Sequence, residues 1–335
     1  MGGIKAFLFK VFLFTGAAAV VYCLMLFGMA NFGPDFVQKN VKYRRGVQGH
    51  TFSRLREIDT VRNIDVLIVG SSQAYRSFDP RIFEKHGIKA FNLGTSAQTM
   101  LQTNFLLYKY LDKVNPRMVI WEVWPNSLTS DGTESLSDLV SNAKNPIELA
   151  PLAVKVGSVT AYNTFLVSAL NYLTGVNQDI VEPTLVRRDS YVGRGFVERH
   201  QEFQKAAEII PPLRTFNQSQ IKHFHESLKL LKDRNIKVLL VDAPVAKRFY
   251  RTYSDNQAFD SLYSSLVRHG LAKAYVNFNE YGNLTLNDTL HFYDYDHLNQ
   301  DGVVEFNEAL LNDGSLNLRA YLESSDSQGL TKINE

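Results

Sequence analysis

One uncharged stretch near the N-terminus constrains the fold of this chain more than any other feature of its sequence. Residues 11–30 have the sequence VFLFTGAAAVVYCLMLFGMA and include no charged side chain. A helix rises about 1.5 Å per residue, so a helix over this stretch would cross the roughly 30 Å hydrocarbon layer of a membrane. We therefore expect a short N-terminal segment at 1–10, a transmembrane anchor at 11–30 and one large domain after them.

The residues that flank this stretch indicate its orientation. Lys5 and Lys10 precede it without any acidic residue, and long C-terminal domains cross membranes largely regardless of their charge. The prediction is a cytoplasmic N-terminus and an extracytoplasmic domain, periplasmic or at the cell surface. A cleaved signal peptide and a buried core helix are the alternatives, although the apolar region of a signal peptide usually covers only about 7 to 15 residues.

A second span is not expected. The next apolar stretch, at 151–176, is interrupted by Lys155 and by several polar residues. Their spacing is typical of an amphipathic helix rather than of a helix surrounded by lipid.

Composition excludes several classes of function. The 335 residues contain 36 Lys and Arg against 34 Asp and Glu, a formal charge of +2, so we expect no nucleic-acid partner. The one cysteine, Cys23, rules out an intrachain disulfide and a cysteine-based zinc site. Neither G-x-G-x-x-G nor a P-loop pattern occurs, so no nucleotide cofactor is expected.

Short apolar runs alternate with helical patterns through the rest of the chain. Alternation of this kind predicts a mostly parallel sheet covered by helices on both faces, a three-layer α/β/α domain of the flavodoxin type. We expect a linker at 31–60, the domain at 61–323 and a polar tail at 324–335. The runs expected to form strands lie at 64–72, 89–96, 117–123, 237–244 and, more weakly, 274–280.

One segment, at 127–216, is too long for a single crossover and contains several prolines. We expect it to be an inserted, partly helical cap that contributes to substrate specificity. It gathers four arginines that could meet an anionic or sugar substrate, although nearby acidic residues favour a solvated mixed-charge surface. These arginines are Arg187, Arg188, Arg194 and Arg199.

Polar residues follow three of the predicted strands, in VGSSQAYRSFDP at 69–80, FNLGTS at 91–96 and WEVWPNS at 121–127. Because parallel strands end at one edge of their sheet, we expect these segments to converge there. A serine hydroxyl needs a base to become a nucleophile, and acyl transfer needs donors for the oxyanion. A fourth segment, FYDYDHLNQDG at 292–302, offers His297, with Asp294 three residues earlier to orient its ring.

These four segments, in this order, resemble the conserved blocks of the SGNH (GDSL-like) hydrolase superfamily. The resemblance covers most of residues 64–311 and implies that Ser72 is the nucleophile, with His297 and Asp294 completing a catalytic triad. It also implies an oxyanion hole formed by the Ser72 and Gly94 amides and the Asn126 side chain. No metal or other cofactor is implied.

Two positions depart from the family pattern. Ser71 replaces the aspartate of the first block, and Trp124 stands where the third block usually has glycine. The Gly-Ser-Ser form resembles the membrane-anchored branch that includes the D-alanyl transfer protein of teichoic acids. Relatives of that branch act on cell-envelope polymers beside a multi-pass membrane acyltransferase, which is therefore the partner that the resemblance implies.

Other interpretations of these residues remain open. Ser71 or Ser72 could cap the helix that follows, and Asp296 could replace Asp294 as the partner of His297. Gly70-x-Ser72-x-Ala74 is similar to the nucleophile elbow of α/β-hydrolases, but that fold usually builds several strands before its serine. A metal site is a further alternative, and its ligands would be His291, Asp294, Asp296 and His297.

The sequence therefore predicts a membrane-anchored serine esterase or O-acyltransferase that acts on O-acyl groups, acetyl above all, of an envelope polymer or exopolysaccharide. Hydrolase and transferase stay open, since both use the same triad. A noncatalytic assembly protein and a lipid esterase are the alternatives of other classes.

Overall fold

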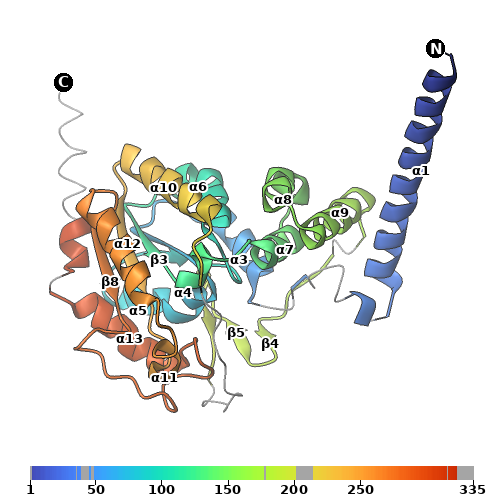
Figure 1. The fold of residues 1–335 in the computed structure, drawn as a ribbon. Coiled ribbons are helices and arrows are strands. Elements are labelled where there is room, and N and C mark those ends of the chain that lie inside the picture. Colours follow the sequence, from blue (N-terminus) through green and yellow to red (C-terminus); the bar gives the residue numbers. More distant parts are fainter. Residues whose placement is uncertain are drawn as a thin grey trace, which may run out of the picture. The chain divides into compact units, whose positions relative to one another are not determined.

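The computed structural model describes residues 2–34, 36–38, 45–46, 49–176, 179–200, 214–314 and 316–322 (Figure 1). The chain forms two compact units. Unit 1 comprises Met1–Arg45 and Leu136–Val181, and unit 2 comprises Gly46–Ser135 and Glu182–Glu335. Each unit is described by itself below.

Unit 1 begins with a helix that is longer than expected. Helix α1 covers Gly2–Phe32, so the predicted separate segment at 1–10 is part of the helix, because neither of its two lysines interrupts helical structure. The stretch Gly3–Phe32 is long and apolar enough to cross a membrane, and little of its most apolar part is buried.

Most of the remaining described residues of unit 1 are helical. The unit contains most of α7 (Thr133–Asn142), then η3 (Pro146–Leu149), α8 (Ala150–Val156) and α9 (Val159–Thr174). The single helix predicted at 151–176 is therefore two helices. Gly157, at φ 70°, ends α8, and the Ser158 side chain caps α9 by accepting a hydrogen bond from the amide of Ala161.

The predicted parallel sheet is confirmed in unit 2. Among the described residues its order is β2-β1-β3-β7-β8, and every neighbouring pair is parallel. Each strand lies inside one of the five predicted apolar runs. Almost all residues of the three central strands are buried, on both faces of the sheet, as expected when helices cover both faces. The strands are β1 (Val66–Val69), β2 (Ala90–Asn92), β3 (Met118–Glu122), β7 (Lys237–Asp242) and β8 (Ala274–Asn277).

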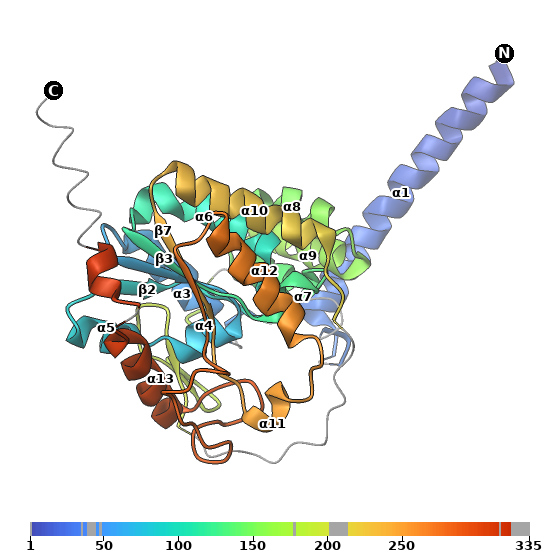
Figure 2. The same ribbon diagram turned by 60° about the vertical axis from the view of Figure 1, so that its left-hand side comes forward.

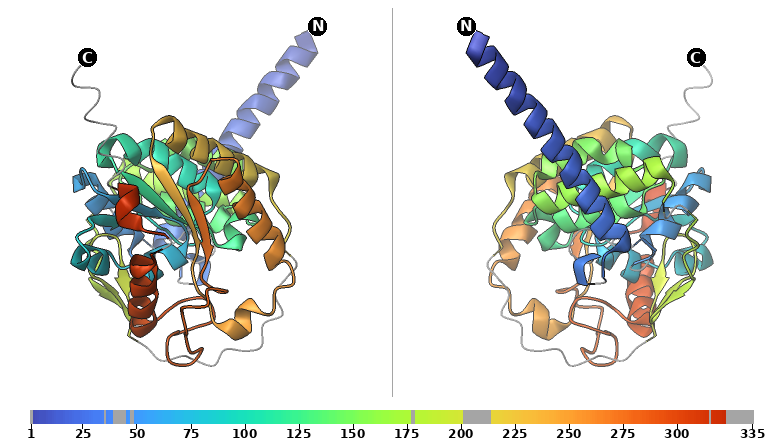
Figure 3. Two further views of the ribbon diagram at one scale, coloured as in Figure 1. Left: turned by 90° about the vertical axis from the view of Figure 1, so that its left-hand side faces the viewer. Right: turned by 90° about the vertical axis from the view of Figure 1, so that its right-hand side faces the viewer.

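Helices cover both faces of this sheet, which gives the predicted three layers (Figures 2 and 3). One layer is formed by α4 (Ser72–Ser77), α5 (Pro80–Lys85) and α13 (Gln300–Asn312). The other is formed by α6 (Met100–Val114), α10 (Gln218–Asp233) and α12 (Asn256–Arg268). In the second layer Phe224 packs edge-on against Trp121 of β3, at a ring-centroid distance of 4.8 Å.

The linker predicted at 31–60 is wrong over its last ten residues. Helix α3 (Thr51–Glu57) and the short η1 (Ile58–Thr60) occupy them and belong to unit 2. Arg54 accounts for the error: it is a charged residue, yet it is fully buried, lies over the Tyr75 ring and donates to the carbonyl of Gly195.

Three short elements complete the described part of the insert. The strands β4 (Leu185–Val186), β5 (Asp189–Tyr191) and β6 (Val197–Glu198) form a small antiparallel sheet in unit 2. Elsewhere in that unit, η2 (Pro125–Leu128) follows β3, and α11 (Lys247–Tyr250) follows β7. The predicted polar tail at 324–335 lies outside the described residues.

Candidate active site

The serine expected to act as the nucleophile begins helix α4, directly after β1. Ser71, the residue before it, caps the helix, since its side chain accepts a hydrogen bond from the amide of Gln73. Capping therefore explains Ser71 and leaves the Ser72 hydroxyl for other contacts. Ser72 is half-buried and faces a cleft.

The structure brings Ser72, His297 and Asp294 together. The Nε2 atom of His297 lies 2.8 Å from Ser72 Oγ, and its Nδ1 atom lies 3.0 Å from both carboxylate oxygens of Asp294. If the carboxylate holds the imidazole proton on Nδ1, Nε2 can accept the serine proton. The Asp294 carboxylate also accepts the backbone amide of His297 at 2.8 Å, which fixes the turn between them.

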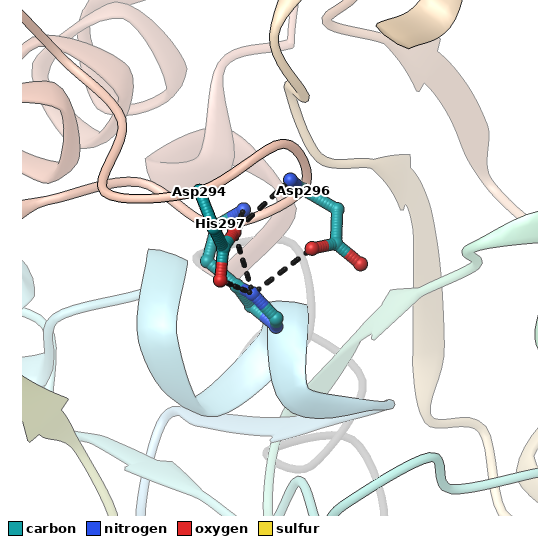
Figure 4. A group of neighbouring side chains, drawn as sticks. All are labelled: Asp294, Asp296 and His297. Carbon is teal, nitrogen blue, oxygen red and sulfur yellow. Dashed lines mark hydrogen bonds and ion pairs between the residues drawn. The ribbon is translucent and has the colours of Figure 1, made fainter. Parts of the chain in front are cut away.

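A second carboxylate reaches the same nitrogen. Asp296 Oδ1 lies 3.1 Å from His297 Nδ1, so the alternative partner joins Asp294 rather than replacing it (Figure 4). Burial disfavours the charged imidazole, but Asp296 and Asp294 outweigh it and raise the pKa of His297 to about 10. The imidazole is thus a strong base whose neutral form becomes abundant only at alkaline pH.

The same three residues are the ones that could hold a metal ion, because their donor atoms lie within 4.8 Å of one another. A cation at Nδ1 would displace the proton that orients the ring toward Ser72. His291, the fourth ligand considered from the sequence, instead accepts the amide of Asn287 on its own Nδ1.

An aromatic and ionic layer supports the ring of His297. The Tyr293 ring stacks on it at 5.5 Å with an interplanar angle of 4°, and the Arg199 guanidinium in turn lies 4.2 Å from the centroid of the Tyr293 ring. Arg199 and Arg76 both bind Asp189 of β5, at 3.2 and 2.8 Å. The predicted insert therefore contributes to the site through Asp189 and Arg199.

One buried carboxylate joins the serine turn to the loop after β3. Glu122 accepts hydrogen bonds from the Ser71 amide at 2.6 Å, the Ser71 hydroxyl at 2.8 Å and the Trp124 amide at 2.5 Å. Burial raises the pKa of Glu122 to about 7 despite these bonds. Gly70, at φ 146°, leaves the space for this carboxylate, because a Cβ there would lie 2.5 Å from Glu122. Glu122 is not among the residues predicted for the site, although a carboxylate at the end of an apolar strand was a signal.

The structure corrects one residue of the predicted oxyanion hole. The Gly94 amide donates to the Asn92 side chain at 3.1 Å, and Gly94 is not among the residues that line the cleft. The lack of a side chain at Gly94 has another reason: a Cβ would lie 2.8 Å from Ala74 in α4. Asn126 does line the cleft with Ser72.

Ala97, unlike Gly94, follows β2 and lines the cleft beside Ser72. It lies in the turn after β2, lines the cleft together with Ser72 and Asn126, and has φ 45°. Left-handed backbone costs a non-glycine residue about 1 to 2 kcal/mol and is concentrated at functional sites. Alanine has no particular preference for positive φ, so the sequence could not predict this conformation at position 97.

The cleft measures about 620 Å³ and is lined mainly by hydroxyl, amide and charged side chains. Both of its arginines are ion-paired, Arg76 with Asp189 and Arg214 with Asp255. Among the four arginines singled out in the insert, none lines the cleft: Arg187 and Arg188 are exposed, Arg194 pairs with Glu84, and Arg199 supports Tyr293 from behind.

No family model matches the chain, and no curated protein matches it. Two solved structures from Bacteroides are similar. One, from Bacteroides fragilis, is described as an acylhydrolase; it is 12% identical, covers 85% of this chain and 100% of its own, and has a TM-score of 0.41. The other, from Bacteroides thetaiotaomicron, is described as a GDSL-like lipase; it is 11% identical, covers 82% of this chain and 98% of its own, and has a TM-score of 0.42.

Proposed function

We propose that the protein is a membrane-anchored serine esterase or O-acyltransferase that removes or transfers O-acyl groups, acetyl above all, on a neutral sugar polymer outside the cytoplasm. The observation that carries the proposal is the contact of His297 Nε2 with Ser72 Oγ at 2.8 Å, with Asp294 behind the ring. Those three groups have the roles and distances that acyl transfer through a serine requires.

The proposed reaction has two halves. Ser72 Oγ attacks the ester carbonyl carbon while His297 Nε2 takes the hydroxyl proton. His297 then gives that proton to the departing sugar oxygen, which leaves an acyl-Ser72 ester. Water or the hydroxyl of an acceptor sugar next attacks this ester while His297 Nε2 takes its proton. His297 then returns that proton to Ser72 Oγ as the acyl group leaves, which restores the serine and the neutral imidazole. The Ser72 and Ala97 amides and the Asn126 side chain are the proposed donors to the oxyanion.

The lining of the cleft supports a sugar substrate over a lipid. Hydroxyl and amide groups such as those of Gln98, Thr129 and Ser130 can bind the hydroxyls of a glycan, whereas a long acyl chain needs an apolar wall. The two ion-paired arginines favour a neutral rather than an anionic sugar. An acyl donor supplied by a multi-pass membrane acyltransferase is compatible with the transferase form of the proposal.

Active-site labelling of the full-length protein in detergent micelles tests the proposal. A fluorophosphonate should label the wild type and fail to label Ser72→Ala and His297→Ala. Ser71→Ala is the matched control. It removes the neighbouring hydroxyl, which donates a hydrogen bond to Glu122 and not to His297, so this variant should still be labelled. EDTA should leave both labelling and ester turnover unchanged.

Substrate panels separate the remaining alternatives. Acetyl esters of neutral sugars should be cleaved faster than octanoyl esters and faster than acetylated uronates. Faster cleavage of octanoyl esters would favour a lipid esterase. A folded wild type that is neither labelled nor active would favour a noncatalytic assembly protein and contradict the proposal.

A further inference from the structure

Helix α9 of unit 1 has an unusual surface for a helix outside a membrane. No charged residue occurs between Lys155 and Asp179, which includes all of α9. Several of its apolar side chains are nevertheless exposed, among them Val159 at 71% and Leu173 at 68%. A surface helix of a water-soluble domain normally carries its charged residues on that face.

The other face of α9 packs against α1. Val167 is buried with Leu26 and Ala30 of α1 in one small apolar cluster. The Tyr22 hydroxyl donates to the Asn163 side chain at 2.6 Å, and Asn31 and Asn171 exchange hydrogen bonds at 2.8 and 3.3 Å.

These contacts show that the two helices run in the same direction. From the first polar pair to the second, the chain advances nine residues along α1 and eight along α9, roughly 13 and 12 Å at 1.5 Å per residue. The segment of α1 that α9 contacts is the last part of the uncharged stretch at 11–30. Tyr22 lies eight residues before its end, or about 12 Å along the helix axis.

We propose that α9 enters the membrane from its outer side beside α1, with its exposed apolar face against lipid. This inference rests on the proposed span of α1: if residues 11–30 occupy the hydrocarbon layer, the part of α9 bonded to Tyr22 lies at the same depth. The lipid-facing surface of α1, which includes Leu24 and Met25, then continues onto α9.

The chemistry of the contact fits this environment. In hydrocarbon, polar side chains are stable only when they bond to one another, and the Tyr–Asn and Asn–Asn pairs between the helices do so. Tyr172 is partly exposed beside Asn171, which is bonded to Asn31 at the outer end of the uncharged stretch, and tyrosine is enriched where a membrane meets water. At 16 residues, α9 extends about 24 Å and is too short to cross the hydrocarbon layer. It therefore reaches about the middle of that layer without adding a second span.

Depth measurements on the full-length protein test this inference. In a Cys23→Ser background, single cysteines at Val159 and Leu173 would be labelled with bimane and the protein placed in phosphatidylcholine vesicles that contain doxyl-labelled lipid. Leu13→Cys in α1 is the control for lipid, and Lys229→Cys on α10 is the control for water. All four side chains are exposed, so the substitutions should not disturb folding, which circular dichroism would verify.

The doxyl group should quench Val159→Cys about as strongly as Leu13→Cys, quench Leu173→Cys less because it lies nearer the outer surface, and leave Lys229→Cys bright. If Leu13→Cys is quenched but both α9 sites resemble Lys229→Cys, the inference fails while the span stands. If Leu13→Cys is also bright, the span fails with it. If the α9 sites are reached by a water-soluble maleimide in vesicles but protected in native membranes, a protein partner covers α9 and the lipid contact is wrong.

Discussion

The two sides of the cleft are built in different ways. The acid–base side comes from one short segment, in which Asp294, Asp296 and His297 lie within four residues of one another. The proposed oxyanion side comes from the ends of three strands, with Ser72 after β1, Ala97 after β2 and Asn126 after β3. The acid–base side can be predicted from the sequence because its contacts are local. The oxyanion side depends on how turns that are distant in the sequence meet in space.

This difference has an energetic counterpart. On the acid–base side two carboxylates act on one imidazole nitrogen, so either can compensate in part for the other. On the oxyanion side each proposed donor comes from its own turn, and Glu122 links the turn after β1 to the turn after β3. We therefore expect substitutions on the acid–base side to change the pH dependence, and those on the oxyanion side to change the rate at every pH.

The largest loss should follow removal of both carboxylates. Asp294→Asn alone should lower kcat/KM about 10³-fold, and Asp294→Asn with Asp296→Asn at least about 10-fold further, because no carboxylate then keeps the proton on Nδ1. Initial rates on a short-chain ester would measure both losses. Equal rates in the single and double variants would mean that Asp296 does not contribute.

Loss of the side-chain donor should rank next. Asn126→Ala should reduce kcat by about 10² to 10³-fold with little change in KM, since the bond forms only as charge develops on the oxygen. Thr215→Ala, which alters the cleft lining elsewhere, is the matched control and should retain its kcat. A loss confined to KM would place Asn126 in substrate binding instead.

Glu122→Gln should affect both sides moderately. The amide can turn only one oxygen toward three donors, so unfolding free energy should fall by about 1 to 3 kcal/mol and kcat by about 10-fold. The raised pKa of Glu122, about 7, also makes a prediction for pH. The folded state holds this proton more tightly than the unfolded state, so wild-type stability should fall as pH rises from about 4.5 to about 7. That part of the fall, measured by urea unfolding, should disappear in the variant.

Asp296→Asn should change pH dependence more than maximal rate. In the wild type, kcat/KM should rise with pH until His297 loses its proton near its pKa of about 10. Without the Asp296 charge this rise should move to lower pH, and activity at pH 7 should increase several-fold. If the pH–rate profile of the variant matches that of the wild type, the charge of Asp296 does not affect the pKa of His297.

The smallest effect is expected at Ala97. Ala97→Gly keeps the amide and relieves the left-handed conformation, so activity should stay within about twofold and stability within about 1 kcal/mol of the wild type. Ala97→Val is the contrasting variant, because a β-branched residue is strained at positive φ. If Ala97→Val keeps full activity, the position of this amide does not matter to the reaction.

Periodicity and chain order predicted much of this molecule. Apolar runs located the five parallel strands, and the Asp294–His297 spacing predicted a contact that the structure contains. Helix α3 escaped prediction because its buried Arg54 looks like a surface residue until Tyr75 and Gly195 are placed beside it. Gly94 was misjudged for a related reason: its missing side chain makes room for α4, and no local pattern distinguishes that need from an oxyanion role.

The long insert bears on how this protein can be divided into exchangeable modules. Residues 136–181 of the insert belong to the same unit as helix α1, whereas the part from Glu182 onward belongs to unit 2 and supplies Asp189 and Arg199 to the side chains that contact Tyr293 beside His297. A chimera that exchanged residues 127–216 as one cassette to alter acceptor choice would therefore also replace part of the support of His297. The productive boundary for such an exchange lies within the insert, near residue 182.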